Sequence, residues 1–140
     1  MEDVRPPKVA TGAVIFSPNN KILLLKSHKW NGKLVVPGGK IHFGETALAC
    51  IQREVLEETG LEIFNIEFLG MCELIQDASF HKPEHFIFLD YVCKAKTEKV
   101  ILDSESQDFV WAKMDEIKNY AITDSSLNLI EKALKEYLKN

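Results

Sequence analysis

The chain has 140 residues, of which 46% are hydrophobic and 27% are charged, and its formal net charge is −4. This length and composition predict one globular domain over residues 1–140 that can bury a core without disulfides. The acidic balance argues against general nucleic-acid binding through a basic face. Because the sequence shows neither a signal-peptide pattern nor an apolar run of membrane-spanning length, we expect a cytoplasmic protein with no membrane partner.

Apolar, β-rich runs dominate the beginning of the chain. Residues 8–16 and 21–25 have strand composition, and the turn-forming residues 17–20 between them predict a hairpin. A third, short strand is expected over residues 33–36. The Pro-Gly-Gly sequence at 37–39 should end it, because the glycines let the chain turn tightly and bring a bare carbonyl close to a ligand.

An amphipathic helix is predicted next. Thr46 is a plausible N-cap and Gly60 has the position of a C-terminal glycine. Leu48, Ile51 and Val55 recur at helical spacing and predict the buried face.

The end of this helix carries an unusual group of charges. Glu54, Glu57 and Glu58 stand at i, i+3 and i+4, so their carboxylates share one face and repel each other. Near a helix C-terminus the helix dipole also disfavours anions. A hard divalent cation reverses both penalties, which makes the cluster a candidate metal site.

Residues 39–61 resemble the Nudix box. The family pattern is matched by Gly39, Glu45, the Arg53-Glu54-Val55 run, Glu57-Glu58 and Gly60-Leu61, with no departure at any specified position. The resemblance implies an α/β/α sandwich with a mixed sheet, and hydrolysis of a nucleoside diphosphate linked to another moiety. Candidate substrates are nucleoside triphosphates, nucleotide sugars and ADP-ribose.

The resemblance also implies a metal site. Glu54, Glu57 and Glu58 match the positions that bind catalytic divalent cations, expected to be Mg²⁺ or Mn²⁺, and the carbonyl of Gly38 matches a backbone ligand. Glu54 also matches a position that acts as the base toward water in some members.

Three further box residues have implied roles. Arg53 matches the position that orients the carboxylates by ion pairing, while Glu45 and Gly39 match supporting positions beside the metals.

The second half of the chain completes an α/β pattern. Strands are predicted over 62–75, 86–96 and 109–112, a polar loop over 76–85, a helical turn from Asp115, and a final helix capped within 123–125. The apolar positions of that helix are Leu127, Ile130, Leu134 and Leu138.

One acidic residue outside the box is a further candidate. The family often uses an acid on a loop that precedes a tryptophan-bearing strand, and the matching stretch here is 103–111. We select Glu105 as a catalytic residue, with Asp103 and Asp108 as competitors and a solvated acidic loop as the alternative.

Other polar and aromatic residues have less specific patterns. Trp30 could stack on a base, but a rim aromatic is favoured, as it is for Trp111. Lys26 could meet a phosphate, but a surface position is favoured for it, as it is for His42; His28 could face a base or phosphate. His81, Lys82 and His85 could contact a substrate, but a mobile polar loop is favoured.

The cysteines Cys50, Cys72 and Cys93 lack metal-site spacing, so we expect buried free thiols.

The sequence therefore predicts a metal-dependent pyrophosphohydrolase whose partner is a small nucleoside diphosphate derivative. The alternative is a binding module that retains the fold as a nucleotide sensor without catalysis, which the intact acidic positions disfavour. A third interpretation, a diphosphate isomerase, is disfavoured because the sequence shows no matching arrangement of catalytic Cys and Glu. A homodimer is possible, since dimers are common in the family.

Overall fold

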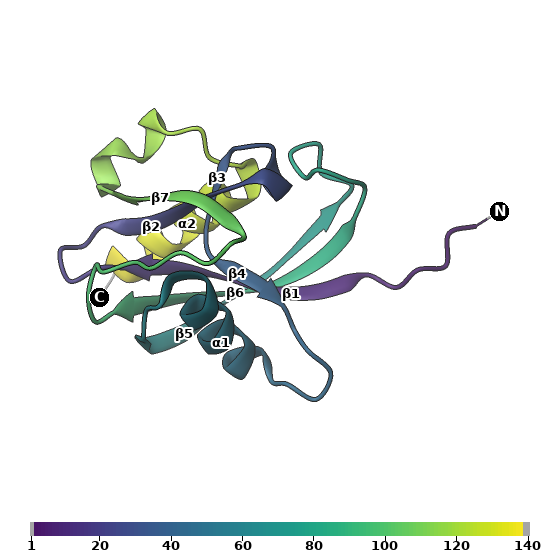
Figure 1. The fold of residues 1–140 in the computed structure, drawn as a ribbon, viewed down its shortest axis with the longest axis horizontal. Coiled ribbons are helices and arrows are strands. Elements are labelled where there is room, and N and C mark those ends of the chain that lie inside the picture. Colours follow the sequence, from purple (N-terminus) through teal and green to yellow (C-terminus); the bar gives the residue numbers. More distant parts are fainter. Residues whose placement is uncertain (1, 139–140) are drawn as a thin grey trace.

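The computed structural model describes residues 2–138, with side chains described as far as residue 137. A mixed seven-stranded sheet lies between two helices (Figure 1). The elements are β1 (Lys8–Phe16), β2 (Ile22–Ser27), η1 (His28–Trp30), β3 (Leu34–Val35), β4 (Gly38–Lys40), α1 (Ala47–Thr59), β5 (Ile63–Ile75), β6 (His85–Ala95), β7 (Ser106–Ala112), η2 (Met114–Asn119) and α2 (Asp124–Leu138). The predicted α/β/α sandwich is confirmed.

Alternation along β1 builds a core on each face of the sheet. Val14 and Phe16 are fully buried in the cluster that packs against α2. Ala13 and Ile15 point the other way, into the cluster formed with α1. Successive side chains of this part of β1 are buried on opposite faces of the sheet, so β1 is a central strand with no polar face.

The predicted hairpin forms, but its two strands soon diverge. β1 and β2 pair in antiparallel fashion at Phe16 and Ile22. Elsewhere β1 pairs with β4 and in parallel with β6, whereas β2 pairs with β3 and β7. The strands therefore form two groups, one around β1 and one around β2, which are joined at the β1–β2 turn.

The glycines after Pro37 differ from the prediction. Gly38 and Gly39 do not form a tight turn; they belong to strand β4, paired with Gly12 and Thr11 of β1. Neither has a positive φ. Glycine is required at position 38 because β4 approaches the β1 backbone closely: a Cβ atom there would overlap the Thr11 carbonyl oxygen.

Helix α1 begins and ends as predicted. The Thr46 hydroxyl accepts a hydrogen bond from the Ala49 amide at 3.1 Å, and Gly60 adopts a left-handed φ of 73°. Ile51 and Val55 are fully buried, but the prediction for Leu48 is wrong, since it is 47% exposed. Burial within α1 starts only at Cys50, so the first turn projects past the core.

The second half of the chain follows the predicted order. β7 starts earlier than expected, because its pairing with β2 continues to Ser27 and Ser106. The Thr123 hydroxyl accepts from the Ser126 amide at 3.3 Å and caps α2. Ile130 is fully buried, and Leu127 and Leu134 pack against the same core. The expectation for Leu138 lies outside the described side chains.

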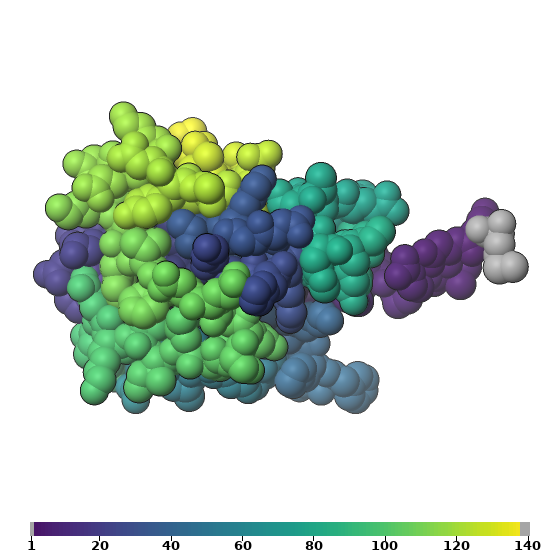
Figure 2. Space-filling model, turned by 45° about the horizontal axis from the view of Figure 1, so that its top comes forward, coloured from purple at the N-terminus to yellow at the C-terminus, as the bar shows by residue number. Residues whose placement is uncertain are grey.

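The loop between β5 and β6 lies against η1. The His81 amide donates to the Lys29 carbonyl at 2.7 Å, and the Asn31 side-chain amide donates to the Ser79 carbonyl at 3.1 Å. Figure 2 shows this loop, in teal, beside the blue segment that contains η1 and β3. Two segments far apart in sequence thus form one edge of the molecule.

The cysteines are all free, and Cys50 and Cys93 are buried as expected. Cys72 is only half-buried, contrary to the prediction, because it lies on β5, the outermost strand beside β6. None of the helices within the described residues is long and apolar enough to span a membrane.

Candidate active site

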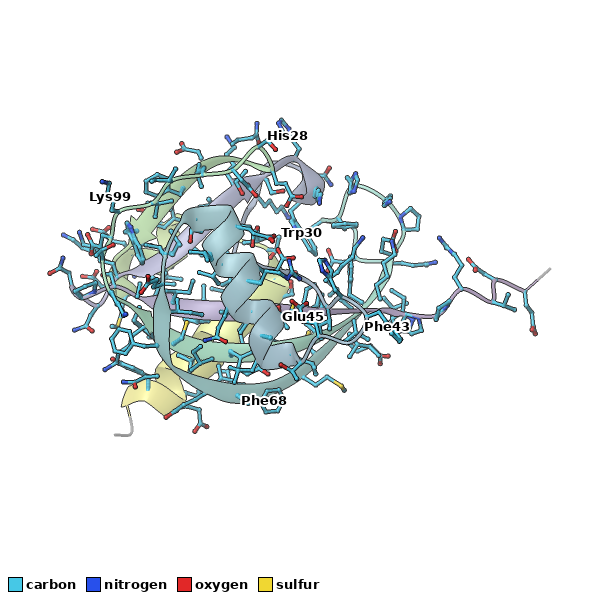
Figure 3. All side chains as sticks on the ribbon, turned by 60° about the horizontal axis from the view of Figure 1, so that its bottom comes forward. His28, Trp30, Phe43, Glu45, Phe68 and Lys99 are labelled. Carbon is cyan, nitrogen blue, oxygen red and sulfur yellow. The ribbon has the colours of Figure 1, made fainter. Side chains whose placement is uncertain are left out.

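A cleft of about 410 Å³ collects most of the residues singled out in the sequence. Figure 3 looks onto α1, where it lies across the sheet, with Glu45 near the beginning of the helix. The predicted site residues that line the cleft are Gly38, Gly39, Arg53, Glu54, Glu57, Glu58 and Glu105. Glu45 and Asp108 are not among its lining residues, whereas Asp103 is.

Arg53 connects the acidic residues of the box. Its Nε lies 2.6 Å from Glu45 Oε2, and its Nη1 lies 2.9 Å from Glu54 Oε1 and 3.1 Å from Glu57 Oε2. Hydrogen bonds from Arg53 lower the pKa of Glu45 to about 2. One guanidinium therefore fixes the positions of three carboxylates, which is the pairing that the resemblance implied.

Glu58 is buried and lies in different surroundings from the acids that Arg53 contacts. It is 8% exposed, and its Oε1 accepts a hydrogen bond from the Gly38 amide at 3.0 Å. Burial, with a further contribution from Glu54, raises the pKa of Glu58 to about 9. Arg53 makes no ion pair with it, so its charge is the least compensated of the box.

Gly39 makes room for another of these carboxylates. A Cβ atom at residue 39 would lie 2.3 Å from Glu54 Cδ. Burial raises the pKa of Glu54 despite its bond to Arg53. The strand β4 and the helix α1 are thus in contact at the point where the acids gather.

The donor set fits a hard divalent cation. Glu54, Glu57 and Glu58 supply carboxylate oxygens in one cleft, and the negative charge around Glu58 is what such an ion would neutralise. Among the described residues, no three His, Cys, Asp or Glu side chains already converge to metal-binding geometry. Arg53 engages Glu54 and Glu57 instead, so binding an ion would require these side chains to reorient.

The loop before β7 forms the other side of the cleft. The Asp103 amide donates to the Glu58 carbonyl at 3.3 Å, which ties the loop to the end of α1. Glu105 is exposed, with an oxygen 3.8 Å from Lys29 Nζ, and its charge contributes to raising the pKa values of Glu54 and Glu58. Glu105 is therefore near the box acids, as predicted, whereas Asp108 lies outside the cleft.

The sequence reasoning missed five lining residues outside the box, or their role in the cleft. Phe80, Phe86 and Phe88 line it together with Trp30, and so does Asp90 of β6. The signal for Asp90 was present, because it is a lone acid within the apolar run of residues 86–93. The phenylalanines gave no such signal, since aromatic residues in strands are usually core.

The remaining candidates lie where expected or outside the cleft. Lys26 and His28 are exposed and do not line it, and His42 is exposed at its rim. Trp111 is half-buried, with its indole nitrogen donating to the Glu98 carbonyl at 2.9 Å. His85 is paired with Glu73 at 2.9 Å, away from the cleft.

Three known proteins illustrate what the chain is similar to. The uncharacterized Nudix hydrolase YvcI of Bacillus subtilis is 26% identical over 121 residues, which cover 86% of this chain and 76% of that protein. The ADP-ribose pyrophosphatase of Methanocaldococcus jannaschii is 42% identical over 57 residues, 39% of this chain and 33% of that protein. The NUDIX domain of Shewanella oneidensis NrtR, solved in complex with ADP ribose, has a TM-score of 0.81 at 21% identity, over 95% of this chain and 90% of that one.

The family model supplies the broadest match. The model of the NUDIX domain covers residues 6–132, which include every strand, the box and most of α2. Nudix hydrolases generally use divalent metal ions, in agreement with the donor set of the cleft. The chain therefore belongs to the NUDIX family of hydrolases.

Proposed function

We propose that this protein is a divalent-metal-dependent pyrophosphohydrolase that cleaves a nucleoside diphosphate linked to another moiety. The observation that carries the proposal is the cleft itself. Its lining combines the box carboxylates with an aromatic wall formed by Trp30, Phe80, Phe86 and Phe88. Carboxylates suited to metal and phosphate, in the same cleft as aromatic rings suited to a planar base, match both parts of a nucleotide.

The metal would be held by the box carboxylates. We assign its ligands to Glu54, Glu57, Glu58 and the carbonyl of Gly38, and we expect Mg²⁺ or Mn²⁺ because both prefer oxygen donors. When bound, such an ion neutralises the charge of the pyrophosphate and lowers the pKa of attacking water.

The protein's own groups would then position the reactants. Water adds to one phosphorus and the bond from that phosphorus to the bridging oxygen breaks. Arg53 holds Glu54 and Glu57 beside the cleft through contacts of 2.9 and 3.1 Å, and both side chains would turn from these positions to reach the ion. Glu54 and Glu105 are the two candidates for the base that accepts the proton from water, because both line the cleft. Glu45 supports Arg53 from outside the cleft.

The substrate belongs to a class that includes nucleoside triphosphates, nucleotide sugars and ADP-ribose. The likeness to an ADP-ribose pyrophosphatase and to a domain crystallised with ADP ribose supports this class. The M. jannaschii match covers only 33% of that protein, so ADP-ribose is one candidate substrate among several.

The test is turnover of a panel of nucleoside diphosphate derivatives with Mg²⁺ or Mn²⁺, with products identified by chromatography. Glu57→Gln should lower kcat at least about 100-fold, because it removes a carboxylate ligand. Glu67→Gln is the matched control, since Glu67 is exposed on β5 and does not line the cleft.

Three outcomes would contradict the proposal. Full activity in excess chelator, or in Glu57→Gln, would refute the metal mechanism. Tight nucleotide binding with no turnover of any panel member would favour the alternative of a non-catalytic nucleotide sensor.

A further inference from the structure

A buried carboxylate outside the box lines the same cleft as the aromatic residues. Asp90 is 7% exposed and occupies the middle of β6. In the strand register it stands between Gly12 of β1 and Gly70 of β5. Glycine at position 12 accommodates the acid, because a Cβ atom there would lie 2.9 Å from Asp90 Oδ1.

No described residue donates a hydrogen bond to the Asp90 carboxylate, and its oxygens are open to the cleft, because no fully buried side-chain oxygen among the described residues lacks a partner. Burial raises the pKa of Asp90 to about 7, opposed only by the positive charge of Lys132 on α2. A largely buried carboxylate whose oxygens face a cleft and have no protein donor keeps only part of its hydration. The lost hydration is replaced if a ligand supplies N–H groups when it enters the cleft.

The walls beside Asp90 suit a planar ligand. Phe86, Phe88 and Asp90 alternate along β6, so their side chains share one face of the sheet. The ring centroids of Phe86 and Phe88 are 5.2 Å apart, and Phe80 continues the aromatic wall at 5.1 Å from Phe86. Trp30 closes it at 4.6 Å from Phe80. A heterocycle stacked on this wall would turn one edge toward Asp90.

The Asp90 carboxylate and the aromatic wall together favour a base whose edge carries hydrogen-bond donors. An ionised carboxylate only accepts hydrogen bonds, so it complements a base edge that only donates. Guanine presents adjacent N1–H and N2–H donors, whereas hypoxanthine presents one and adenine pairs one donor with an acceptor. Two donated bonds would also favour the charged form of the acid.

We propose that Asp90 determines base specificity by accepting hydrogen bonds from the N1–H and N2–H groups of guanine, so that the preferred substrates are guanosine diphosphate derivatives. This inference rests on the proposed function, because it assigns the base-binding part of the same cleft.

The experiment measures binding, so it does not depend on turnover. The α,β-methylene analogues of GDP, IDP and ADP cannot be hydrolysed at the bridging position, and their Kd values are measured by calorimetry with Mg²⁺. The wild-type protein should bind the guanosine analogue about tenfold or more tightly than either of the others, as loss of a bond to a charged group predicts.

Asp90→Asn separates recognition from a structural role. The carboxamide offers one acceptor and one donor, so the guanosine preference should fall to within about twofold or pass to the adenosine or inosine analogue. Asp108→Asn is the matched control, because Asp108 is exposed outside the cleft. It should leave all three Kd values unchanged.

Several results would overturn the inference. Equal affinities in the wild-type protein would do so without any variant, as would a preference for the adenosine analogue. Asp90→Asn weakening all three analogues equally would make Asp90 a structural residue. If the panel is hydrolysed without a preference for guanine, this inference alone is wrong. If the protein binds the guanosine analogue selectively but hydrolyses no panel member, only the proposed hydrolysis is wrong.

Discussion

At the scale of single residues, the box acids divide by environment although they are close in sequence. Glu45 is stabilised as an anion by Arg53, which holds its pKa at about 2. Glu58 is buried without an arginine, and its pKa rises to about 9. The same residue type therefore contributes to stability in opposite directions, and the tertiary surroundings decide which.

The raised pKa of Glu58 predicts a pH-dependent stability in the presence of chelator. Above about pH 4.5 the unfolded state ionises this group while the folded state keeps it protonated, so stability should fall as pH rises toward about 9. The slope is at most about 1.4 kcal/mol per pH unit. Urea unfolding at pH 6 to 9 would measure it, and Glu58→Gln should remove that part of the slope. Identical slopes in the wild-type protein and the variant would contradict the assignment.

At the scale of elements, adjacent glycines of β4 serve different contacts. Gly38 approaches the backbone of β1, since its Cβ would meet the Thr11 carbonyl oxygen. Gly39 approaches a side chain, since its Cβ would meet Glu54. Backbone in a paired strand cannot yield without losing pairing, whereas a glutamate side chain can rotate.

This difference predicts two distinct outcomes for alanine. Gly38→Ala should destabilise the fold by at least about 2 kcal/mol, because β4 must separate from β1. Gly39→Ala should cost less stability but lower kcat about 100-fold by displacing Glu54. Denaturant unfolding and steady-state kinetics on both variants would test this. The reverse pattern, with Gly39→Ala unfolded and Gly38→Ala fully active, would show that the close contacts are wrongly assigned.

At the scale of the whole molecule, the cleft joins segments that are distant in sequence. The acidic helix, the loop of residues 103–105, η1 and the 76–85 loop meet around one space. The approach of Glu105 to the box acids depends on β7 pairing with β2 and on the bond from the Asp103 amide to the Glu58 carbonyl.

This placement predicts that Glu105→Gln lowers kcat more than tenfold while the melting temperature stays unchanged, because the residue is exposed and lines the cleft. Asp108→Asn should have no effect on either quantity. Equal activity of both variants and the wild-type protein would remove Glu105 from the site.

The elements with local signals were predicted well. Thr46 and Gly60 fixed the ends of α1, and the turn residues fixed the first hairpin. The wrong predictions concern positions whose burial or pairing depends on residues distant in sequence. Leu48 has the helical spacing of a core residue but precedes the start of burial, and Gly38-Gly39 have turn composition but pair with β1.

The sequence by itself identified the family and singled out the box residues as candidates, because the family pattern consists of side chains at fixed spacing along one helix. Only the tertiary structure decided which acid is buried, which loop faces the box, and that Asp90 shares the cleft with an aromatic wall. Those relations depend on strand register and loop contacts between residues distant in the chain, and no local pattern encodes them.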